Sequence, residues 1–205
     1  MLPSATFFIA ALVLAITPGP GIAYVVARTA AGGRAEGLAS CVGTGLGGML
    51  HVAAAALGLS VLLAQSAAAF SLVKYIGGAY LVYLGIRLLL SKATRAPARA
   101  RSTGARRALL EGILVEALNV KTALFFLAFL PQFLFTGPSV VAQLVFMGTV
   151  CVLLNTLVDV AAVIGAARLL RSEASERQRA RLLNKASGVT LVGLGLYVAM
   201  SRRGA

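Results

Sequence analysis

The sequence predicts an all-α integral membrane protein with six transmembrane helices, arranged as two inverted repeats of three helices each. Of its 205 residues, 59% are hydrophobic and only 12% are charged, whereas soluble domains carry about 25% charged residues. Apolar segments long enough to cross roughly 30 Å of hydrocarbon recur along the chain. A short motif in the first half also recurs in the second half. The lipid bilayer is therefore the expected surroundings of a single transmembrane domain that covers residues 1–205.

Charged residues and turn residues separate six apolar segments. A spanning helix needs about 20 apolar residues, so six spans leave room for short loops but for no soluble catalytic domain. We expect helices because backbone groups in lipid must pair within their own segment, and because the alternating pattern of barrel strands is absent. The predicted spans are 4–27, 37–63, 69–90, 109–134, 139–167 and 186–201.

Basic residues predict the orientation. Arg28 and Arg34 follow the first span, and the loops after the third and fifth spans carry six basic residues each, whereas 64–68 and 135–138 carry none. The positive-inside rule then places the three basic loops in the cytoplasm and both termini outside, although the basic pair Arg202–Arg203 opposes this. Membrane topology thus explains the net charge of +13, and we expect no nucleic-acid binding, which needs a solvated basic surface.

The recurring motif predicts the repeat. Residues 78–85 (GAYLVYLG) and 188–195 (GVTLVGLG) share the pattern G-x-x-L-V-x-L-G, and a Cys-Val pair recurs at the same shift of 110 positions, at Cys41 and Cys151. Successive units of three helices must enter the membrane from opposite sides, as in many secondary transporters. Repeat one would cover about 1–91 and repeat two about 109–205, joined by a basic cytoplasmic linker, 92–108. Chance similarity between apolar segments is the alternative.

Two prolines and two glycines interrupt the first span near its middle. The segment reads Thr17, Pro18, Gly19, Pro20, Gly21. Proline has no N–H group, so preceding carbonyls lose their helical donors. Pro20 suits the first position of a new half-helix, whose free N–H groups and positive dipole end are expected to bind a substrate carboxylate. A simple packing kink is the alternative.

Polar residues at depth mark the fourth and fifth spans. Glu116, Asn119 and Lys121 lie inside an apolar span, where each charge costs about 2.5–3.5 kcal/mol, so we expect them to face a cavity or a partner. Snorkelling of Glu116 and Lys121 towards the interface is the alternative. In the fifth span Asp159 lies one helical turn from Asn155, on the same face.

Asp159 and Glu116 are the candidate proton carriers, with a static ion pair to Lys121 as the alternative. Asn155 joins the candidate substrate-binding residues. His51, the only histidine, is a candidate pathway residue, although a lone histidine is more often a hydrogen-bonded packing residue. With no second His or Cys beside it, we expect neither a metal nor any other cofactor.

Four segments together resemble the LysE-type translocators, also called the lysine exporter and homoserine/threonine resistance family. They are ITPGPG, GTGLGGMLH, KYIGGAYLVYLGI and ALNVKTALFFLAFLPQF. The resemblance implies a secondary transporter of the bacterial inner membrane that exports amino acids or related small metabolites from the cytoplasm by proton antiport. Carried over by position, it implies that Thr17, Pro18, Gly19 and Pro20 form the first break, with Asn119, Lys121 and Asp159 as further site residues.

The chain departs from the family pattern at two positions. Family members usually read N-P-K where this chain has Asn119-Val120-Lys121, which leaves the strength of the second helix break open. Many have Asn where this chain has Glu116, and the added acid either favours a cationic substrate or neutralises Lys121.

Three further questions concern function and assembly. A transmembrane thiol-disulfide carrier that uses Cys41 and Cys151 is the alternative function, although neither cysteine has a neighbour that would activate a thiolate. We expect no enzyme, because neither G-x-S-x-G nor H-E-x-x-H is present. The glycine-rich segment 43–48 would serve packing within one chain or in a homo-oligomer.

Overall fold

The computed structural model describes residues 4–90, 101–135 and 139–169, together with residue 185 and the short stretches 188–189, 191–196 and 199–200. Every regular element in this part of the chain is helical. Residues 92–100 of the predicted linker, most of the loop after the fifth predicted span and the pair Arg202–Arg203 lie outside the described residues. The predicted sixth span, 186–201, is described only in part.

The helices follow the predicted order along the chain. They are α1 (Ala5–Ile16), α2 (Pro20–Gln65), α3 (Ala67–Leu90), α4 (Ala105–Ala117), α5 (Val120–Ala128), the 3₁₀ helix η1 (Leu130–Phe133) and α6 (Val140–Leu169). Helix α2 consists of two arms that join at Gly33, whose φ of 73° and ψ of −165° are not helical. The first predicted span therefore corresponds to α1 plus the first arm of α2, and the second predicted span to the second arm.

Local sequence explains where the broken helices start and stop. Ser4 caps α1, its side chain accepting a hydrogen bond from the N–H of Phe7. Helix α1 ends at Thr17, whose ψ of 114° is extended, because the residue before a proline avoids the helical region. Pro20 then occupies the first helical position of α2, as predicted from its fixed φ and missing N–H.

The fourth predicted span is also broken. Asn119 lies between α4 and α5, and its side chain accepts a hydrogen bond from the backbone N–H of Lys121, which starts the new helix. The segment Ala105–Ala117 is bent by 45° relative to Val120–Phe133. Val120 therefore does not remove the second break, because the cap at Asn119 produces it without a proline.

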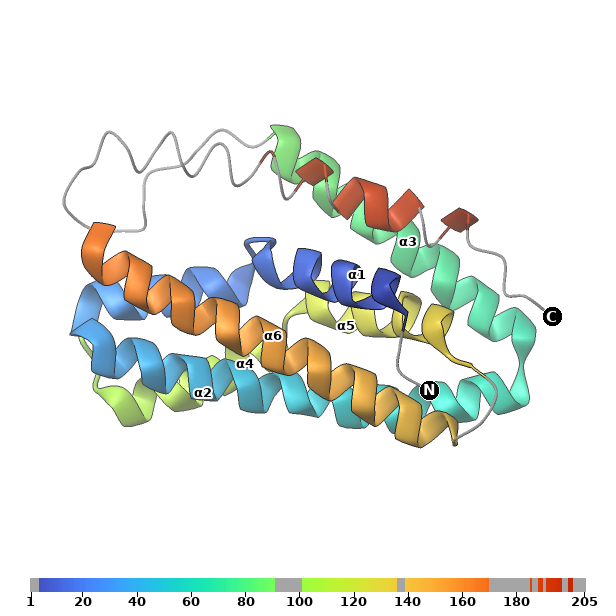
Figure 1. The fold of residues 1–205 in the computed structure, drawn as a ribbon, viewed down its shortest axis with the longest axis horizontal. Helices are drawn as coiled ribbons and strands as arrows, with labels where there is room; N and C mark the ends of the chain where they lie inside the picture. Colours follow the sequence, from blue (N-terminus) through green and yellow to red (C-terminus); the bar gives the residue numbers. More distant parts are fainter. Residues whose placement is uncertain are drawn as a thin grey trace.

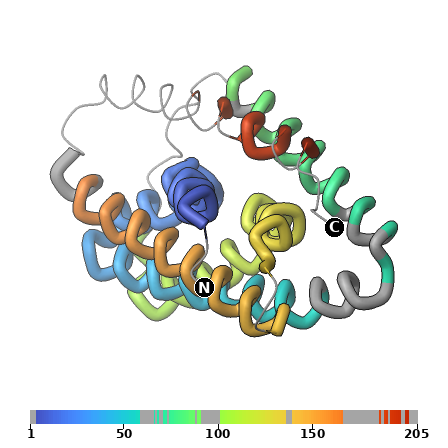
Figure 2. The backbone as a smooth tube through the Cα atoms, turned by 45° about the vertical axis from the view of Figure 1, so that its right-hand side comes forward, coloured from blue at the N-terminus to red at the C-terminus, as the bar shows by residue number. Residues whose placement is uncertain are grey.

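The short half-helices lie inside the bundle and the long helices surround them. In Figure 2, α1 and α5 are seen nearly end-on in the middle of the molecule, with α2, α4 and α6 on one side and α3 on the other. Figure 1 shows the long helix α6 crossing in front of α2 and beside α1. The main core joins aromatic and aliphatic side chains of these helices, including Phe7, Leu14, Phe125, Phe129 and Leu144, all fully buried.

The glycines of α2 bring neighbouring helices close within one chain. A Cβ on Gly43 would lie 2.2 Å from the carbonyl oxygen of Leu109 in α4, and one on Gly47 would lie 2.6 Å from the carbonyl oxygen of Ile113. On the α6 side, a Cβ on Gly48 would lie 3.0 Å from Val152. This glycine-rich face is thus used for packing inside the protein.

The two copies of the recurring motif pack against each other. Gly85 lies against the carbonyl of Gly188, and a Cβ there would be 2.6 Å from that oxygen; Gly195 lies equally close to the carbonyl of Gly78. The first residue of each copy therefore meets the last residue of the other, so the two segments run antiparallel. The two contacts are equivalent under the repeat, because Gly85 corresponds to Gly195 and Gly188 corresponds to Gly78 at the shift of 110 positions.

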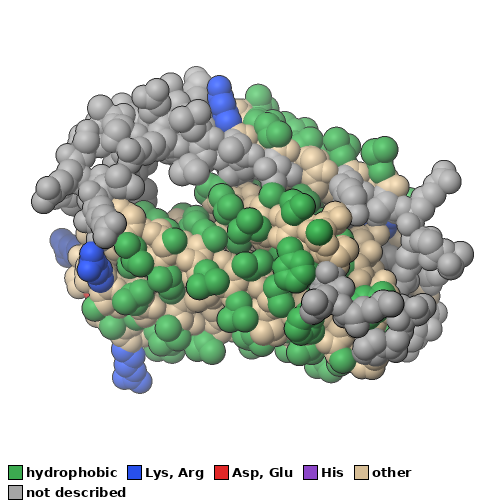
Figure 3. All heavy atoms as spheres, viewed as in Figure 1, with side chains coloured by type: hydrophobic (Ala, Val, Ile, Leu, Met, Phe, Trp, Pro, Cys, Tyr) green, Lys and Arg blue, Asp and Glu red, His purple; other side chains and the backbone are tan. Residues whose placement is uncertain are grey.

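Large apolar side chains cover much of the outer surface. Among the described residues, Leu57 is 69% exposed, Leu118 70% and Leu157 65%. In the face shown in Figure 3, hydrophobic and neutral side chains fill the centre, and most Lys and Arg side chains stand at the end where α2 bends. A surface of this kind suits lipid rather than water.

Length and composition support membrane crossing for part of the described chain. The stretches Pro20–Gly58 and Val140–Gly165 are long and apolar enough to cross a bilayer, and the bent pair Ala105–Ala117 with Val120–Phe133 adds a third if it counts as one span. The larger number of six spans stays a prediction.

We predict that Gly43→Ala destabilises the protein by about 1–3 kcal/mol, because the new methyl group would overlap the Leu109 carbonyl in a packed interface. The free energy of unfolding, measured by denaturation of the purified protein in detergent, tests this. Gly58→Ala is the matched control in the same helix, since a Cβ at Gly58 meets nothing within 4 Å. Equal stability of the two variants would contradict the packing assigned to α2.

Candidate functional site

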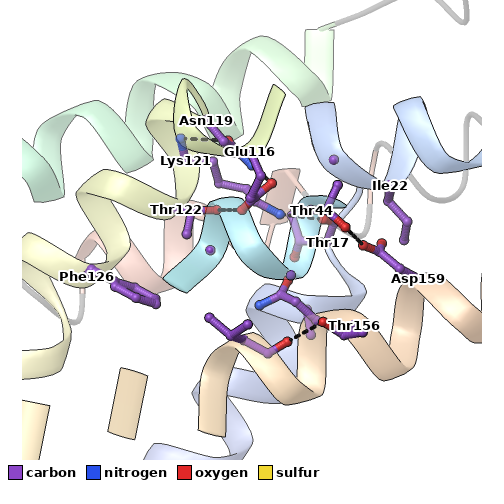
Figure 4. A pocket seen from close by; sticks show the side chains of 16 residues that line it. Thr17, Ile22, Thr44, Glu116, Asn119, Lys121, Thr122, Phe126, Thr156 and Asp159 are labelled. Atoms are coloured by element: carbon purple, nitrogen blue, oxygen red, sulfur yellow. Dashed lines mark hydrogen bonds between the residues drawn. The ribbon is translucent and has the colours of Figure 1, made fainter. Parts of the chain in front are cut away.

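A polar cavity lies where the two broken helices meet α2 and α6. Its volume is about 450 Å³ when the space at its open mouth is included. Within this conformation, the side chains that line the cavity leave space for about one water molecule. Figure 4 shows the side chains that converge on it from helices far apart in the sequence. The lining residues include Thr17, Gly21, Thr44, Glu116, Asn119, Lys121, Thr122, Asn155 and Asp159.

Lys121 caps the broken end of α1. Its ammonium donates hydrogen bonds to the carbonyl oxygens of Thr17 at 2.8 Å and Leu14 at 3.3 Å. Pro18 has no N–H to offer the Leu14 carbonyl, so a side chain from α5 supplies the missing donor. The side chain passes directly over Gly19, where a Cβ would lie 3.0 Å from the Lys121 nitrogen.

Glu116 lies at the opposite end of the same break. Its Oε2 accepts a hydrogen bond from Asn119 Nδ2 at 2.9 Å, and its Oε1 accepts one from the hydroxyl of Thr122 at 2.6 Å. A Cβ on Gly21 would lie 2.7 Å from Oε2, so this glycine leaves room for the carboxylate. The N–H groups of Gly21 and Ile22, in the first turn of α2, form no hydrogen bond within the described part of the chain.

Asp159 faces the cavity from α6. Its Oδ2 accepts a hydrogen bond from the hydroxyl of Thr44 in α2 at 2.9 Å, and its Oδ1 has no hydrogen-bond partner among the described residues. Asn155, one turn earlier, uses its Nδ2 to bond the carbonyl of Cys151 in its own helix. Asp159, a largely buried residue, thus offers one carboxylate oxygen to any group that enters the cavity.

The structure contains no static ion pair between Lys121 and either acid. The ion pairs within 4 Å among the described residues involve other side chains. Lys121 and Glu116 are each 8% exposed, so neither reaches the surface of the protein as the snorkelling alternative would require. The alternatives of a static pair and of snorkelling therefore do not describe this conformation.

Most of the predicted site residues come together. Thr17, Gly21, Asn155 and Asp159 line the cavity with the three polar residues of the fourth span. Pro18, Gly19 and Pro20 shape the break without lining the cavity. His51 lies behind the lining, where its Nε2 is 2.8 Å from the backbone oxygen of Glu116 and its ring packs against Phe126.

Sequence reasoning missed two hydroxyl residues that hold the acids. Thr44 lies in the glycine-rich segment 43–48, and its hydroxyl is the partner of Asp159. Thr122 lies in the first turn of α5, six residues after Glu116, whose carboxylate it bonds. Two features of the sequence could have pointed to these residues. Thr44 is a polar residue within a glycine-rich segment, and Thr122 directly follows the Asn119-Val120-Lys121 sequence.

A second polar cluster joins the start of α4 to the region of the α2 bend. Glu36 is 3% exposed, and its Oε1 accepts hydrogen bonds from Ser102 Oγ and from the N–H groups of Thr103 and Gly104. It thereby caps α4, which starts at Ala105, with a carboxylate at the positive end of the helix dipole.

Arg28 connects the partners of this second cluster. It donates to Thr103 Oγ1 at 2.7 Å and lies 3.3 Å from Glu111 and 3.7 Å from Glu36. Glu111 also accepts a hydrogen bond from the hydroxyl of Tyr24 at 3.1 Å. Apart from the pair Arg28–Glu36, these contacts join the segment before residue 37 to the segment after residue 100.

The two cysteines lie in separate surroundings. Cys41 and Cys151 are both free and buried; Cys151 belongs to the main core, and Cys41 packs with Val25 and Val163 in a smaller cluster. Nothing in this arrangement favours the thiol-disulfide carrier.

The described part of the chain is helical, with apolar stretches long enough to cross a membrane and a polar cavity between them. The family model for LysE type translocators matches residues 12–202, and the chain belongs to this family. The family resemblance expected from the motifs is thereby confirmed.

Similar proteins cover nearly the whole chain. An uncharacterised membrane protein of Vibrio cholerae is 30% identical over 200 residues, 96% of each chain. A homoserine/homoserine lactone efflux protein of Salmonella typhimurium is 28% identical and covers 96% of this chain and 95% of its own. A leucine efflux protein of Salmonella choleraesuis is 24% identical, with 95% and 93% covered. No solved structure matches the chain.

We predict that Asn119→Ala lowers the free energy of unfolding by about 1–2 kcal/mol, because it removes the cap of α5 and a donor to Glu116. Chemical denaturation in detergent measures this. Asn155→Ala is the control, since its amide bonds only a carbonyl of its own helix, and it should cost less. A loss for Asn155→Ala as large as that for Asn119→Ala would show that the cap does not stabilise the break.

Proposed function

We propose that this protein is a secondary transporter that exports amino acids or related small metabolites from the bacterial cytoplasm by proton antiport. The main support for this proposal is the cavity between the two broken helices. N–H groups without acceptors, at the start of α2, and buried charged side chains face this one small space. Irregular backbone and ionisable side chains at such depth are tolerated where they line a pathway. The efflux activities named for the similar proteins from Salmonella support the substrate class.

The substrate would lie across the break in the first span. Its carboxylate would meet the free N–H groups at the start of α2 or the Lys121 ammonium, and its amine would meet Asp159 or Glu116. Asp159 Oδ1 is a carboxylate oxygen without a partner among the described residues at the cavity, which supports a role for this acid in holding the amine.

Asp159 and Glu116 would also carry the coupling proton. The protonated form of a carboxyl group carries the proton, and the ionised form binds the substrate ammonium, so proton and substrate compete for the same side chain. Binding of the substrate would therefore release a proton, and departure of the substrate would take one up. This linkage is what antiport requires.

Alternating access would come from two inverted repeats of three spans, about 1–91 and about 109–205. The antiparallel packing of the two motif copies, with Gly78 against Gly195 and Gly85 against Gly188, supports this symmetry. We place the protein in the inner membrane with both termini outside, so the Arg28 cluster would lie at the cytoplasmic end. The contacts of Arg28 and Tyr24 with Glu111 join the two repeats, and they would break when the cavity opens to the cytoplasm.

The direct test is counterflow in proteoliposomes. Vesicles that contain the purified protein are loaded with an unlabelled amino acid, and uptake of the labelled amino acid is followed for each of the twenty and for homoserine. We expect uptake above that of protein-free vesicles for at least one compound, and we expect an imposed pH gradient to drive its net flux. No uptake of any compound would refute the proposal.

We predict that Asp159→Asn lowers net transport driven by a pH gradient about tenfold or more, because Asn cannot carry a proton. Exchange of substrate for substrate should fall less, because it moves no net proton and the Asn side-chain oxygen can still accept a hydrogen bond from the amine. Both fluxes are measured in the same vesicles, with Gly58→Ala as a control that lies away from the cavity. Unchanged pH-driven flux in Asp159→Asn would remove this residue from the coupling.

A further inference from the structure

The break in the first span leaves carbonyl groups without hydrogen-bond donors at one end and N–H groups without acceptors at the other. The last carbonyls of α1 lack helical donors, and the dipole of α1 makes this end negative. The first N–H groups of α2, at Gly21 and Ile22, lack acceptors, and the dipole of α2 makes that end positive. A zwitterionic amino acid carries the two complementary groups, an ammonium and a carboxylate.

The protein places its own ammonium and carboxylate at these two ends. The Lys121 ammonium bonds the carbonyls of Leu14 and Thr17, and the Glu116 carboxylate lies against Gly21. Gly19 and Gly21 each leave the room that one of these two groups occupies. Figure 4 shows both side chains reaching from the fourth span towards the break near Thr17.

We propose that Lys121 and Glu116 act in the empty transporter as an internal substitute for the substrate, and that a zwitterionic amino acid binds by displacing both from the break. This inference rests on the proposed export function and adds the way in which the ligand is admitted. On admission the ligand ammonium would replace that of Lys121 at the carbonyls of Leu14 and Thr17, and its contact with Asp159 would follow. Once displaced, the two side chains carry opposite charges and start from neighbouring turns, so they can pair with each other instead of remaining as isolated buried charges.

Two features of the site agree with displacement. The interior room for about one water molecule means that a ligand must move side chains before it fits. The Glu116 carboxylate also makes no hydrogen bond with Gly21 or Ile22, because its partners are Asn119 and Thr122. It is therefore held next to the N–H groups without satisfying them, and a ligand carboxylate that bonds them would form the better contact.

The competing role for Lys121 is direct attraction of the substrate carboxylate. The two roles predict opposite effects of removing its charge. If Lys121 attracts the ligand, its loss weakens binding; if Lys121 occupies the place of the ligand ammonium, its loss strengthens binding.

The experiment measures binding of L-leucine, L-leucine methyl ester and N-acetyl-L-leucine by isothermal titration calorimetry to the purified protein and to Lys121→Met and Glu116→Gln. The methyl ester carries only the ammonium, and the N-acetyl derivative carries only the carboxylate. If Lys121 and Glu116 each occupy their end of the break about nine-tenths of the time, removing one of these side chains tightens binding of the matching ligand group about tenfold.

Displacement gives a crossed pattern. Lys121→Met binds leucine and the methyl ester more tightly and leaves the N-acetyl derivative unchanged, whereas Glu116→Gln binds leucine and the N-acetyl derivative more tightly and leaves the methyl ester unchanged. Weaker binding of leucine and the N-acetyl derivative to Lys121→Met would overturn the inference in favour of direct attraction. No gain for any ligand in either variant would overturn it as well.

Gly21→Ala provides a second variant that keeps every charge. Its Cβ would fill the place of the carboxylate and would displace the end of the Glu116 side chain rather than backbone; the free energy of unfolding, measured beside that of Gly58→Ala, shows whether the variant is folded. We expect a loss of affinity for leucine and for the N-acetyl derivative, because the methyl group fills the place of a carboxylate, with binding of the methyl ester unchanged. If the wild-type protein shows no counterflow of any amino acid, the proposed function fails; if counterflow is present and the crossed pattern is absent, only this inference fails.

Discussion

The hydrogen bonds from Lys121 to the end of α1 are the interaction on which the arrangement of the site depends. A helix interrupted inside an apolar bundle leaves carbonyl groups without donors, and each unmet group costs several kcal/mol in lipid. Thr17 and Leu14 avoid that cost because the ammonium of Lys121 reaches them from α5. In this conformation a side chain of the fourth span therefore satisfies the carbonyl groups at the break in the first span.

The rest of the cavity follows from this contact. Lys121 approaches the backbone of the break closely, and Gly19 leaves the room for it. Asn119 caps α5 just before Lys121, so the Lys121 side chain starts from the first turn of a new helix. Glu116 then falls one turn earlier, beside the second glycine of the break. Asp159 completes the group of charges from α6, held by Thr44. Polar groups gather in this cavity and in the Arg28 cluster, while the surface between carries large apolar side chains.

Much of the fold could be read from the sequence because membrane surroundings restrict the choices. Apolar length and loop charges predicted the helices near their observed bounds, and Pro18 and Pro20 predicted both the end of α1 and the start of α2. The contacts inside the cavity could not be read in the same way. The spacing of Glu116, Lys121 and Asp159 was compatible with an ion pair, and only the three-dimensional arrangement shows that Lys121 bonds carbonyl groups instead. The partners Thr44 and Thr122 come from segments whose orientation depends on tertiary packing, and the capping of α4 by Glu36 joins positions more than sixty residues apart.

The central claim is that the two helix breaks and Asp159 enclose one cavity that water and substrate reach. Thiol labelling tests it most directly: in a background with Cys41→Ala and Cys151→Ala, single substitutions Thr44→Cys and Thr156→Cys place thiols at the cavity, and Leu157→Cys places one on the apolar outer surface. We expect a small, water-soluble, membrane-permeant methanethiosulfonate reagent to modify the two cavity thiols, and a transported amino acid to slow this reaction. The thiol at position 157 should be modified slowly, at a rate that the amino acid does not change. Cavity thiols that stay unmodified, or that react at a rate no transported amino acid changes, would contradict the central claim.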